Sequence, residues 1–213
     1  MHGVDVFWSF RSPYSYLAIP DLLALREDYE VSVNLRVVLP IAVRTKATLF
    51  DRSNPKPAMY IVMDAFRRAE MLNRPIHWPS PDPIVQNFET LEVAEEQPYI
   101  YRISYLGVEA ARRGCALELA EALSTDIWSG APGWNEEDRL AATVGSVGHT
   151  LEDMEQAIAG YDVQAIIEDN HAALDSAGHW GVPTCVFNNE PFFGQDRIDT
   201  LRWRLDQAGV AKR

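Results

Sequence analysis

The sequence of 213 residues has little cysteine and no long apolar run. Its two cysteines, Cys115 and Cys185, form no Cys-x-x-Cys pair, which argues against a disulfide framework and against a sulfur-bound metal site. We expect both thiols to be reduced and buried. The apolar stretches, such as residues 37–43, are only a few residues long, whereas a membrane-spanning helix needs about 20. We therefore expect no transmembrane span.

Basic residues are also scarce, since 19 Lys and Arg face 31 Asp and Glu, for a net charge of −12. No more than two basic residues are adjacent, so the basic patch that binds a phosphate backbone is missing. Residues 1–5 lack the basic region and apolar stretch that begin a secretory signal. We expect a cytoplasmic protein that binds neither nucleic acid nor membrane.

Hydrophobic residues make up 47% of the chain, which is enough for a substantial core. Residues 4–10 and 31–39 alternate apolar and polar side chains and predict two strands. Between them, residues 14–29 have helical spacing of apolar residues, with Pro13 at the start. This order predicts a right-handed crossover between two parallel strands.

The middle of the chain is predicted to be helical. Pro40 ends the second strand, residues 51–57 have the turn chemistry of a loop, and residues 75–83 are a proline-rich connector. Apolar spacing predicts helices over residues 58–72, 99–113, 116–128, 135–142 and 151–159.

The last part of the chain returns to mixed structure. A helix is predicted over residues 163–177, a strand over 185–187, a hairpin turn at 188–191, a returning strand at 192–193 and a closing helix over 196–205. The predicted order is therefore β-α-β, a helical insertion, and α-β-β-α.

Ser12 is the most informative candidate residue. It follows the first predicted strand and opens a helix with Pro13, where unpaired N–H groups and the helix dipole favour an anion such as a thiolate. A second interpretation is that Ser12 only caps the helix. Both roles can coexist.

Two further segments carry candidate chemistry. Residues 181–184, Gly-Val-Pro-Thr, precede a strand, and we expect a cis Val182–Pro183 bond close to Ser12, although an ordinary trans proline is the alternative. Residues 193–197, Phe-Gly-Gln-Asp-Arg, open the last helix and either hold a zwitterion or serve as another cap.

Histidine gives no metal site. His171 and Asp175 have helical i, i+4 spacing, but the further donors that zinc needs are missing. His77, His149 and His179 stand apart, which favours structural roles. The sequence also contains no G-x-S-x-G elbow and no phosphate loop.

Residues 7–18, 181–184 and 192–197, together with the helical insertion, resemble the 2-hydroxychromene-2-carboxylate isomerase and kappa-class glutathione transferase family, whose domain is similar to that of DsbA. The resemblance implies an α/β fold, in which a thioredoxin-like domain is interrupted by an all-helical insertion domain. It places residues 1–57 and 161–213 in the first domain and 58–160 in the second. It also implies glutathione as cofactor, a cytoplasmic setting and a homodimer.

The resemblance implies roles for individual residues. Disulfide oxidoreductases of this kind carry Cys-x-x-Cys where this chain has Ser12-Pro13-Tyr14-Ser15, so dithiol exchange cannot occur there. A hydroxyl can instead donate a hydrogen bond to the sulfur of glutathione and lower the pKa of that thiol. Ser12 is then the thiolate partner, and the cofactor-binding residues are Asn54, Val182, Pro183, Gln195 and Asp196. The glutathione-binding Lys of the family has no clear counterpart here, and Lys56 is the nearest substitute.

The activity implied is a glutathione-dependent isomerisation of a small aromatic substrate similar to 2-hydroxychromene-2-carboxylate. Two alternatives stay open: a kappa-like transferase that leaves glutathione on an electrophile, and a thioredoxin-fold binding protein without catalysis. Product analysis separates the two enzymes, and glutathione binding separates both from the third.

Overall fold

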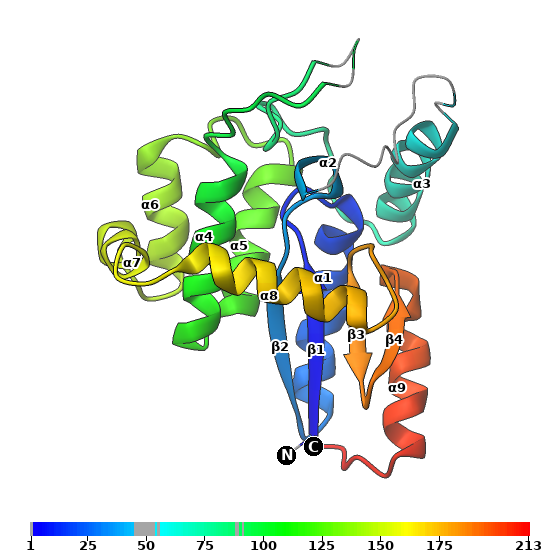
Figure 1. The fold of residues 1–213 in the computed structure, drawn as a ribbon. Coiled ribbons are helices and arrows are strands. Elements are labelled where there is room, and N and C mark those ends of the chain that lie inside the picture. The colour runs from blue at the N-terminus through cyan, green and yellow to red at the C-terminus, as the bar shows by residue number, and fades with distance from the viewer. Residues whose placement is uncertain (1, 45–53, 55, 88–89, 91) are drawn as a thin grey trace.

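The computed structural model describes residues 2–44, 54, 56–87, 90 and 92–213. A four-stranded sheet with the order β2-β1-β3-β4 lies at its centre (Figure 1). Strand β1 (His2–Trp8) pairs in parallel with β2 (Val31–Val37), and α1 (Pro13–Asp28) connects them, so the predicted crossover is confirmed. Strand β3 (Thr184–Phe187) is antiparallel to β1 and to β4 (Glu190–Phe193).

Strand β1 is shifted by two residues towards the N-terminus relative to the predicted segment 4–10. The alternating pattern was misleading because β1 is a central strand, covered on both faces, so that Phe7 is buried as well as Val6 and Trp8. The strand ends after Trp8, and the Ser12 N–H donates to the Ser9 carbonyl in the turn that leads into α1. This turn places Ser12 just beyond the end of the sheet.

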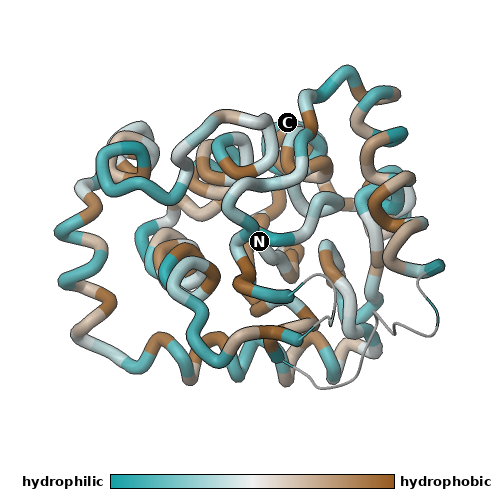
Figure 2. Tube along the Cα trace, turned by 90° about the horizontal axis from the view of Figure 1, so that it is seen from above, coloured by the Kyte–Doolittle hydropathy of each residue, from teal (hydrophilic) through white to brown (hydrophobic). Residues whose placement is uncertain are grey.

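Helices cover both faces of the sheet. Helix α8 (Val163–Ser176) crosses one face, and α1 and α9 (Ile198–Gln207) lie on the other (Figure 1). Phe7 packs with Leu174 of α8, whereas Val6 and Trp8 belong to the core shared with α1. Seen from above, the helices carry teal and brown stretches in alternation, as amphipathic helices do (Figure 2).

The helices predicted between β2 and α8 are all present. They are α3 (Lys56–Met71), α4 (Ile100–Arg113), α5 (Ala116–Trp128), α6 (Glu137–Ser146) and α7 (Leu151–Ile158). The sequence pattern missed the short α2 (Ile41–Arg44), which begins directly after Pro40. The Trp128 indole N–H of α5 donates to the Phe10 carbonyl at 2.9 Å and so ties the helical part to the end of β1. The exact domain limits at residues 57 and 161 stay a prediction.

The hairpin between β3 and β4 is tighter than predicted. Asn188 and Asn189 alone form the turn, and both have positive φ, 51° and 64°, as a two-residue hairpin turn requires. Pro191 is tolerated because β4 is an edge strand.

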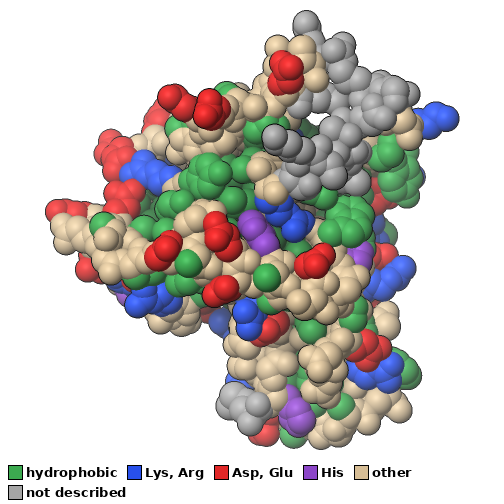
Figure 3. Space-filling model, in the orientation of Figure 1, with side chains coloured by type: hydrophobic (Ala, Val, Ile, Leu, Met, Phe, Trp, Pro, Cys, Tyr) green, Lys and Arg blue, Asp and Glu red, His purple; other side chains and the backbone are tan. Residues whose placement is uncertain are grey.

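Among the described residues, none of the helices combines the length and the hydrophobicity that a membrane-spanning segment requires. On the face drawn in Figure 3, the described acidic and basic side chains are interspersed.

Candidate active site

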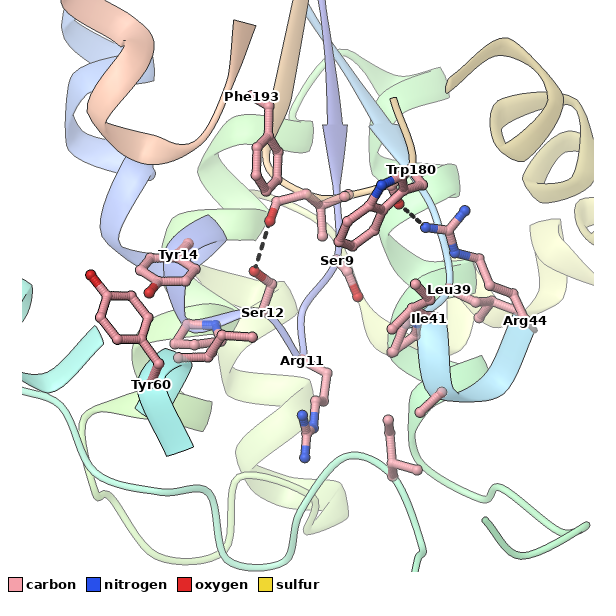
Figure 4. A pocket seen from close by; sticks show the side chains of 17 residues that line it. Ser9, Arg11, Ser12, Tyr14, Leu39, Ile41, Arg44, Tyr60, Trp180 and Phe193 are labelled. Carbon is pink, nitrogen blue, oxygen red and sulfur yellow. Dashed lines mark hydrogen bonds between the residues drawn. The ribbon is translucent and has the colours of Figure 1, made fainter. Parts of the chain in front are cut away.

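A cavity of about 330 Å³ opens where β1 and β2 end and β3 begins (Figure 4). This volume lies at the lower end of the range for small-molecule sites. Most of the lining side chains are apolar or aromatic. The lining residues are Ser9, Arg11, Ser12, Pro13, Tyr14, Leu39, Pro40, Ile41, Ala42, Arg44, Tyr60, Ile61, Ile84, Trp180, Gly181, Val182 and Phe193.

Ser12 combines the two roles that the sequence left open. It is the N-cap of α1, and its hydroxyl oxygen accepts a hydrogen bond from the Ser15 N–H at 3.2 Å. The same hydroxyl donates to the Val182 carbonyl at 3.3 Å (Figure 4). Because the hydroxyl has one proton, a sulfur that accepts it must replace the Val182 carbonyl as acceptor.

The Val182–Pro183 peptide bond is cis, as predicted, and Val182 reaches Ser12. Within the described residues, the Val182 N–H has no hydrogen-bond partner, although Val182 lines the cavity. The Pro183 carbonyl accepts from the Gly194 N–H at 2.9 Å, and Gly194 has φ of 108°, a conformation that favours glycine. This segment therefore presents a free backbone donor beside the Ser12 hydroxyl.

Arg11, next to Ser12, forms a two-point hydrogen-bonded pair with Asp82. The distances are 3.2 and 3.0 Å, and the side chains are only 14% and 7% exposed. The Arg11 guanidinium also lies over the Trp78 ring, 4.9 Å from its centroid. The charge of Arg11 is thus balanced within the protein.

Tyr14 and Tyr60 line the side of the cavity next to α3 (Figure 4). The Tyr14 hydroxyl donates to Asp64 at 2.8 Å. Burial, and then the Asp64 carboxylate, raise the pKa of Tyr14 well above its ordinary value. Tyr14 is therefore a neutral hydrogen-bond donor and is not a general base.

His171 of α8 supports the opposite wall, at the end of β2. Its Nε2 accepts a hydrogen bond from the Leu39 N–H at 2.9 Å. Burial, with the nearby Arg44 cation as a second cause, lowers the pKa of His171 from 6.5 to about 4, while Glu168 opposes this shift. The imidazole is neutral in the folded protein and holds the backbone of the cavity wall.

This arrangement predicts a loss of stability in acid. As the pH falls from 6.5 towards 4, the unfolded His171 binds a proton that the folded one does not, so the free energy of unfolding decreases. In His171→Gln, the amide oxygen can accept from the Leu39 N–H without titrating, and we expect a weaker pH dependence over this range. Urea unfolding measures both proteins, and identical pH dependence would contradict the assignment.

The remaining predicted glutathione ligands lie outside the cavity lining. Gln195 is buried at the start of a 3-10 turn (Gln195–Arg197), and its amide oxygen accepts from Arg68 at 2.9 Å. The Asp196 side chain is half exposed and lies 3.4 Å from Arg197. Asn54 is exposed, and Lys56 is the exposed first residue of α3. Their roles as ligands stay predictions.

Neither cysteine belongs to the cavity lining. Cys185 is buried in β3, and burial raises the pKa of its thiol to about 12. Cys115 is only partly buried, contrary to expectation, because it precedes α5 at the end of a turn. Both are free, as predicted.

Sequence reasoning missed two residues that shape the cavity, Arg44 and Trp180, which come from separate segments that no local pattern joins. Phe193, the first residue of the motif at residues 193–197, also lines the cavity. The Phe193 ring stacks on His179, with centroids 4.0 Å apart, and His179 accepts from the Gly181 N–H at 2.9 Å. Trp180 directly precedes the motif at residues 181–184, whereas no motif in the sequence marks Arg44.

Comparisons with known proteins agree with this architecture. A family model described as DSBA-like thioredoxin domain matches residues 3–206. None of the curated proteins compared with the sequence matches it. The predicted fold class, a thioredoxin-like domain with a helical insertion, is confirmed.

Solved structures share the fold at low sequence identity. A 2-hydroxychromene-2-carboxylate isomerase has a TM-score of 0.72 at 19% identity, over 97% of this chain and 95% of that one. A probable DsbA oxidoreductase from Streptomyces coelicolor has a TM-score of 0.69 at 15% identity, over 98% and 90%. The cytosolic disulfide reductase DsbM from Pseudomonas aeruginosa, solved with GSH, has a TM-score of 0.63 at 15% identity, over 96% and 99%.

Proposed function

Because the chain belongs to the DsbA-like thioredoxin family, we propose that it is a glutathione-dependent isomerase whose substrate is similar to 2-hydroxychromene-2-carboxylate, an intermediate of aromatic degradation. The observation that carries the proposal is the Ser12 hydroxyl, which lies at the N-terminus of α1, hydrogen-bonded to Val182, in a largely apolar cavity. The fold shared with a 2-hydroxychromene-2-carboxylate isomerase and with a disulfide reductase solved with GSH supports it.

The described residues fit the cysteinyl part of glutathione. Among the described residues, the Val182 N–H is unpaired, and the Val182 carbonyl becomes available as a hydrogen-bond acceptor when the Ser12 hydroxyl turns away. A residue with both groups free pairs with an extended peptide as a neighbouring strand does. Ser12 and the positive end of the α1 dipole then favour the thiolate over the thiol.

Glutathione held by Ser12 and Val182 would supply a thiolate nucleophile for reversible addition to a conjugated carbon of the substrate, and it would be regenerated. Ser12 donates a hydrogen bond from its hydroxyl to the sulfur and takes no part in redox chemistry. Tyr14, kept neutral by its bond to Asp64, forms part of the wall beside it. The apolar wall from Leu39, Ile41 and Ile84 excludes water from an aromatic ring.

The chain itself cannot supply dithiol chemistry at this place. Ser12 and Ser15 occupy the two positions that cysteines take in disulfide oxidoreductases, and Cys185 is a buried thiol with a raised pKa. The missing thiols therefore favour a reaction in which glutathione provides the sulfur.

The test is to incubate the protein with 2-hydroxychromene-2-carboxylate, with and without glutathione, and to measure both product and total glutathione. We expect isomerisation that requires glutathione and leaves its amount unchanged. S-methylglutathione, which has no free thiol, is the control and is expected to bind without supporting turnover. Consumption of glutathione in proportion to product would instead indicate a transferase.

Titration calorimetry with glutathione tests the third possibility. Absence of binding heat and of thermal stabilisation at millimolar glutathione would overturn both enzyme proposals in favour of a binding protein.

A cytoplasmic homodimer belongs to the same proposal. The exposed apolar side chains of α3, Met59, Tyr60 and Met63 at 66%, 55% and 55%, support a protein contact there, and light scattering measures the mass in solution.

A further inference from the structure

Arg44 is a cation in the cavity wall without a carboxylate partner. Arg11 and Arg44 are the two charged residues of the described lining, and Arg11 is paired with Asp82. Within the described residues, Arg44 forms no ion pair, and its guanidinium donates to the Trp180 carbonyl (Figure 4). Its Nε atom is buried without a hydrogen-bond partner.

The Arg44 guanidinium is partly buried, and its hydrogen-bonding capacity is incompletely used by the described residues. Burial lowers the pKa of the guanidinium, and the carboxylate of Asp175 only partly offsets this effect. Buried charges in proteins are normally paired, and guanidinium groups offer five N–H donors in a planar fork. No acidic residue belongs to the described lining, although acidic residues outnumber basic ones by 31 to 19 in the chain. An anion in the cavity would therefore meet no carboxylate in the described lining, and Arg44 is the lining cation there that lacks an ion-pair partner among the described residues.

We propose that Arg44 binds the carboxylate of the second substrate while the apolar wall holds its ring. The fork of a guanidinium matches a carboxylate in two parallel hydrogen bonds, which fixes the orientation of the bound molecule. Leu39 and Ile41 lie on the same side of the cavity as Arg44, and Trp180 lies beside it (Figure 4). The substrate class is thus a planar apolar ring system with a carboxylate. The assignment to a second substrate rests on the proposed function.

The position of Arg44 separates this carboxylate from one end of glutathione. Ser12 lies between Arg44 on one side and Tyr14 and Tyr60 on the other (Figure 4). Burial and Asp64 raise the pKa of Tyr14 most, and Asp196, expected to bind the γ-glutamyl end, adds a smaller contribution, so we expect that end on the tyrosine side. The glycyl carboxylate of glutathione is the other possible source of the anion, and the experiment below tells the two apart.

The experiment measures binding of trans-cinnamate and of its neutral analogue trans-cinnamamide by calorimetry, with glutathione titrated separately. For the wild-type protein we expect cinnamate to bind more tightly than the amide. In Arg44→Gln, the affinity for cinnamate should fall roughly 10- to 100-fold, the range for hydrogen bonds to a charged group, whereas affinities for the amide and for glutathione stay within about twofold. Arg112→Gln, an exposed arginine of α4, is the matched control and should bind as the wild type does.

Arg44→Lys is a second variant, for the case that Arg44→Gln does not fold. It keeps the charge but loses the planar fork of the guanidinium, so we expect it to retain part of the preference for cinnamate. Thermal unfolding shows which variants are folded. Equal affinity of the wild type for cinnamate and cinnamamide would overturn the inference. Weaker binding of glutathione in Arg44→Gln, with the preference for cinnamate intact, would also overturn it and assign Arg44 to the glycyl carboxylate. Arg44-dependent binding of cinnamate without any isomerisation would support the site and refute only the proposed function.

Discussion

Ser12→Ala is expected to lower the turnover of the glutathione-dependent isomerisation by roughly 100-fold or more, the scale of losing a positioned hydrogen-bond donor. The thiolate would lose the hydroxyl of the α1 N-cap, which faces Val182 in the cavity. Without this donor, the pKa of bound glutathione rises, so the pH of half-maximal rate should also move upward. Steady-state rates over a range of pH measure both effects.

A loss of the helix cap must be separated from the loss of chemistry. Ser12 accepts from the Ser15 N–H, so the alanine variant also loses about 1 kcal/mol of stability, and rates must be compared where both proteins are folded. Ser15→Ala is the matched control, because the Ser15 hydroxyl is buried in the same turn without a hydrogen-bond partner in the described chain. Unchanged turnover in Ser12→Ala, or an equal loss in Ser15→Ala, would refute the role of Ser12.

Ser12 could be predicted because its evidence is local. A strand, a serine and a proline before a helix lie within one short stretch, and the physics of helix N-termini predicts the cap, which the structure shows, and the anion site, which stays a prediction. The cis bond at Pro183 was also predictable, since proline is the residue that allows it and its place before a strand resembles a known family.

The residues that close the cavity were not predictable in the same way. Arg44 follows β2 and Trp180 precedes β3, and they meet because the end of β2 and the start of β3 lie at the same end of the sheet. Arg11 and Asp82 form a pair although the helix and second strand of the crossover and part of the helical insertion lie between them in the sequence. Sequence periodicity reports which face of an element is buried, but it carries no information on which distant segment covers that face.

The fold shows the same division between local and distant information. The helices of the insertion were predicted because each has its own amphipathic period, whereas β1 was displaced by two residues because both of its faces are buried. Helix α2 is a single short turn, too brief for any period to reveal it. Errors therefore concentrate at the ends of strands, where the cavity lies.

Asp82→Ala is expected to destabilise the protein by about 3 to 5 kcal/mol, the range for removing one partner of a buried ion pair. The substitution would leave the Arg11 guanidinium, only 14% exposed, without its counter-charge. It would also remove the acceptor for the Ile84 N–H, which Asp82 binds at 2.9 Å. Urea unfolding at neutral pH measures the loss.

Asp28→Ala is the matched control, since Asp28 pairs with Arg202 at the surface and its side chain is 54% exposed. Exposed pairs contribute less than about 1 kcal/mol, so the two alanine variants should differ by several-fold in their effect. The double variant Arg11→Met, Asp82→Leu removes both charges and should be more stable than Asp82→Ala alone, because no buried charge is left unpaired. Equal losses in Asp82→Ala and Asp28→Ala would show that the Arg11–Asp82 pair is effectively solvated. In that case Arg11 would remain open to a ligand anion, and the distinction between Arg11 and Arg44 in the cavity would fail.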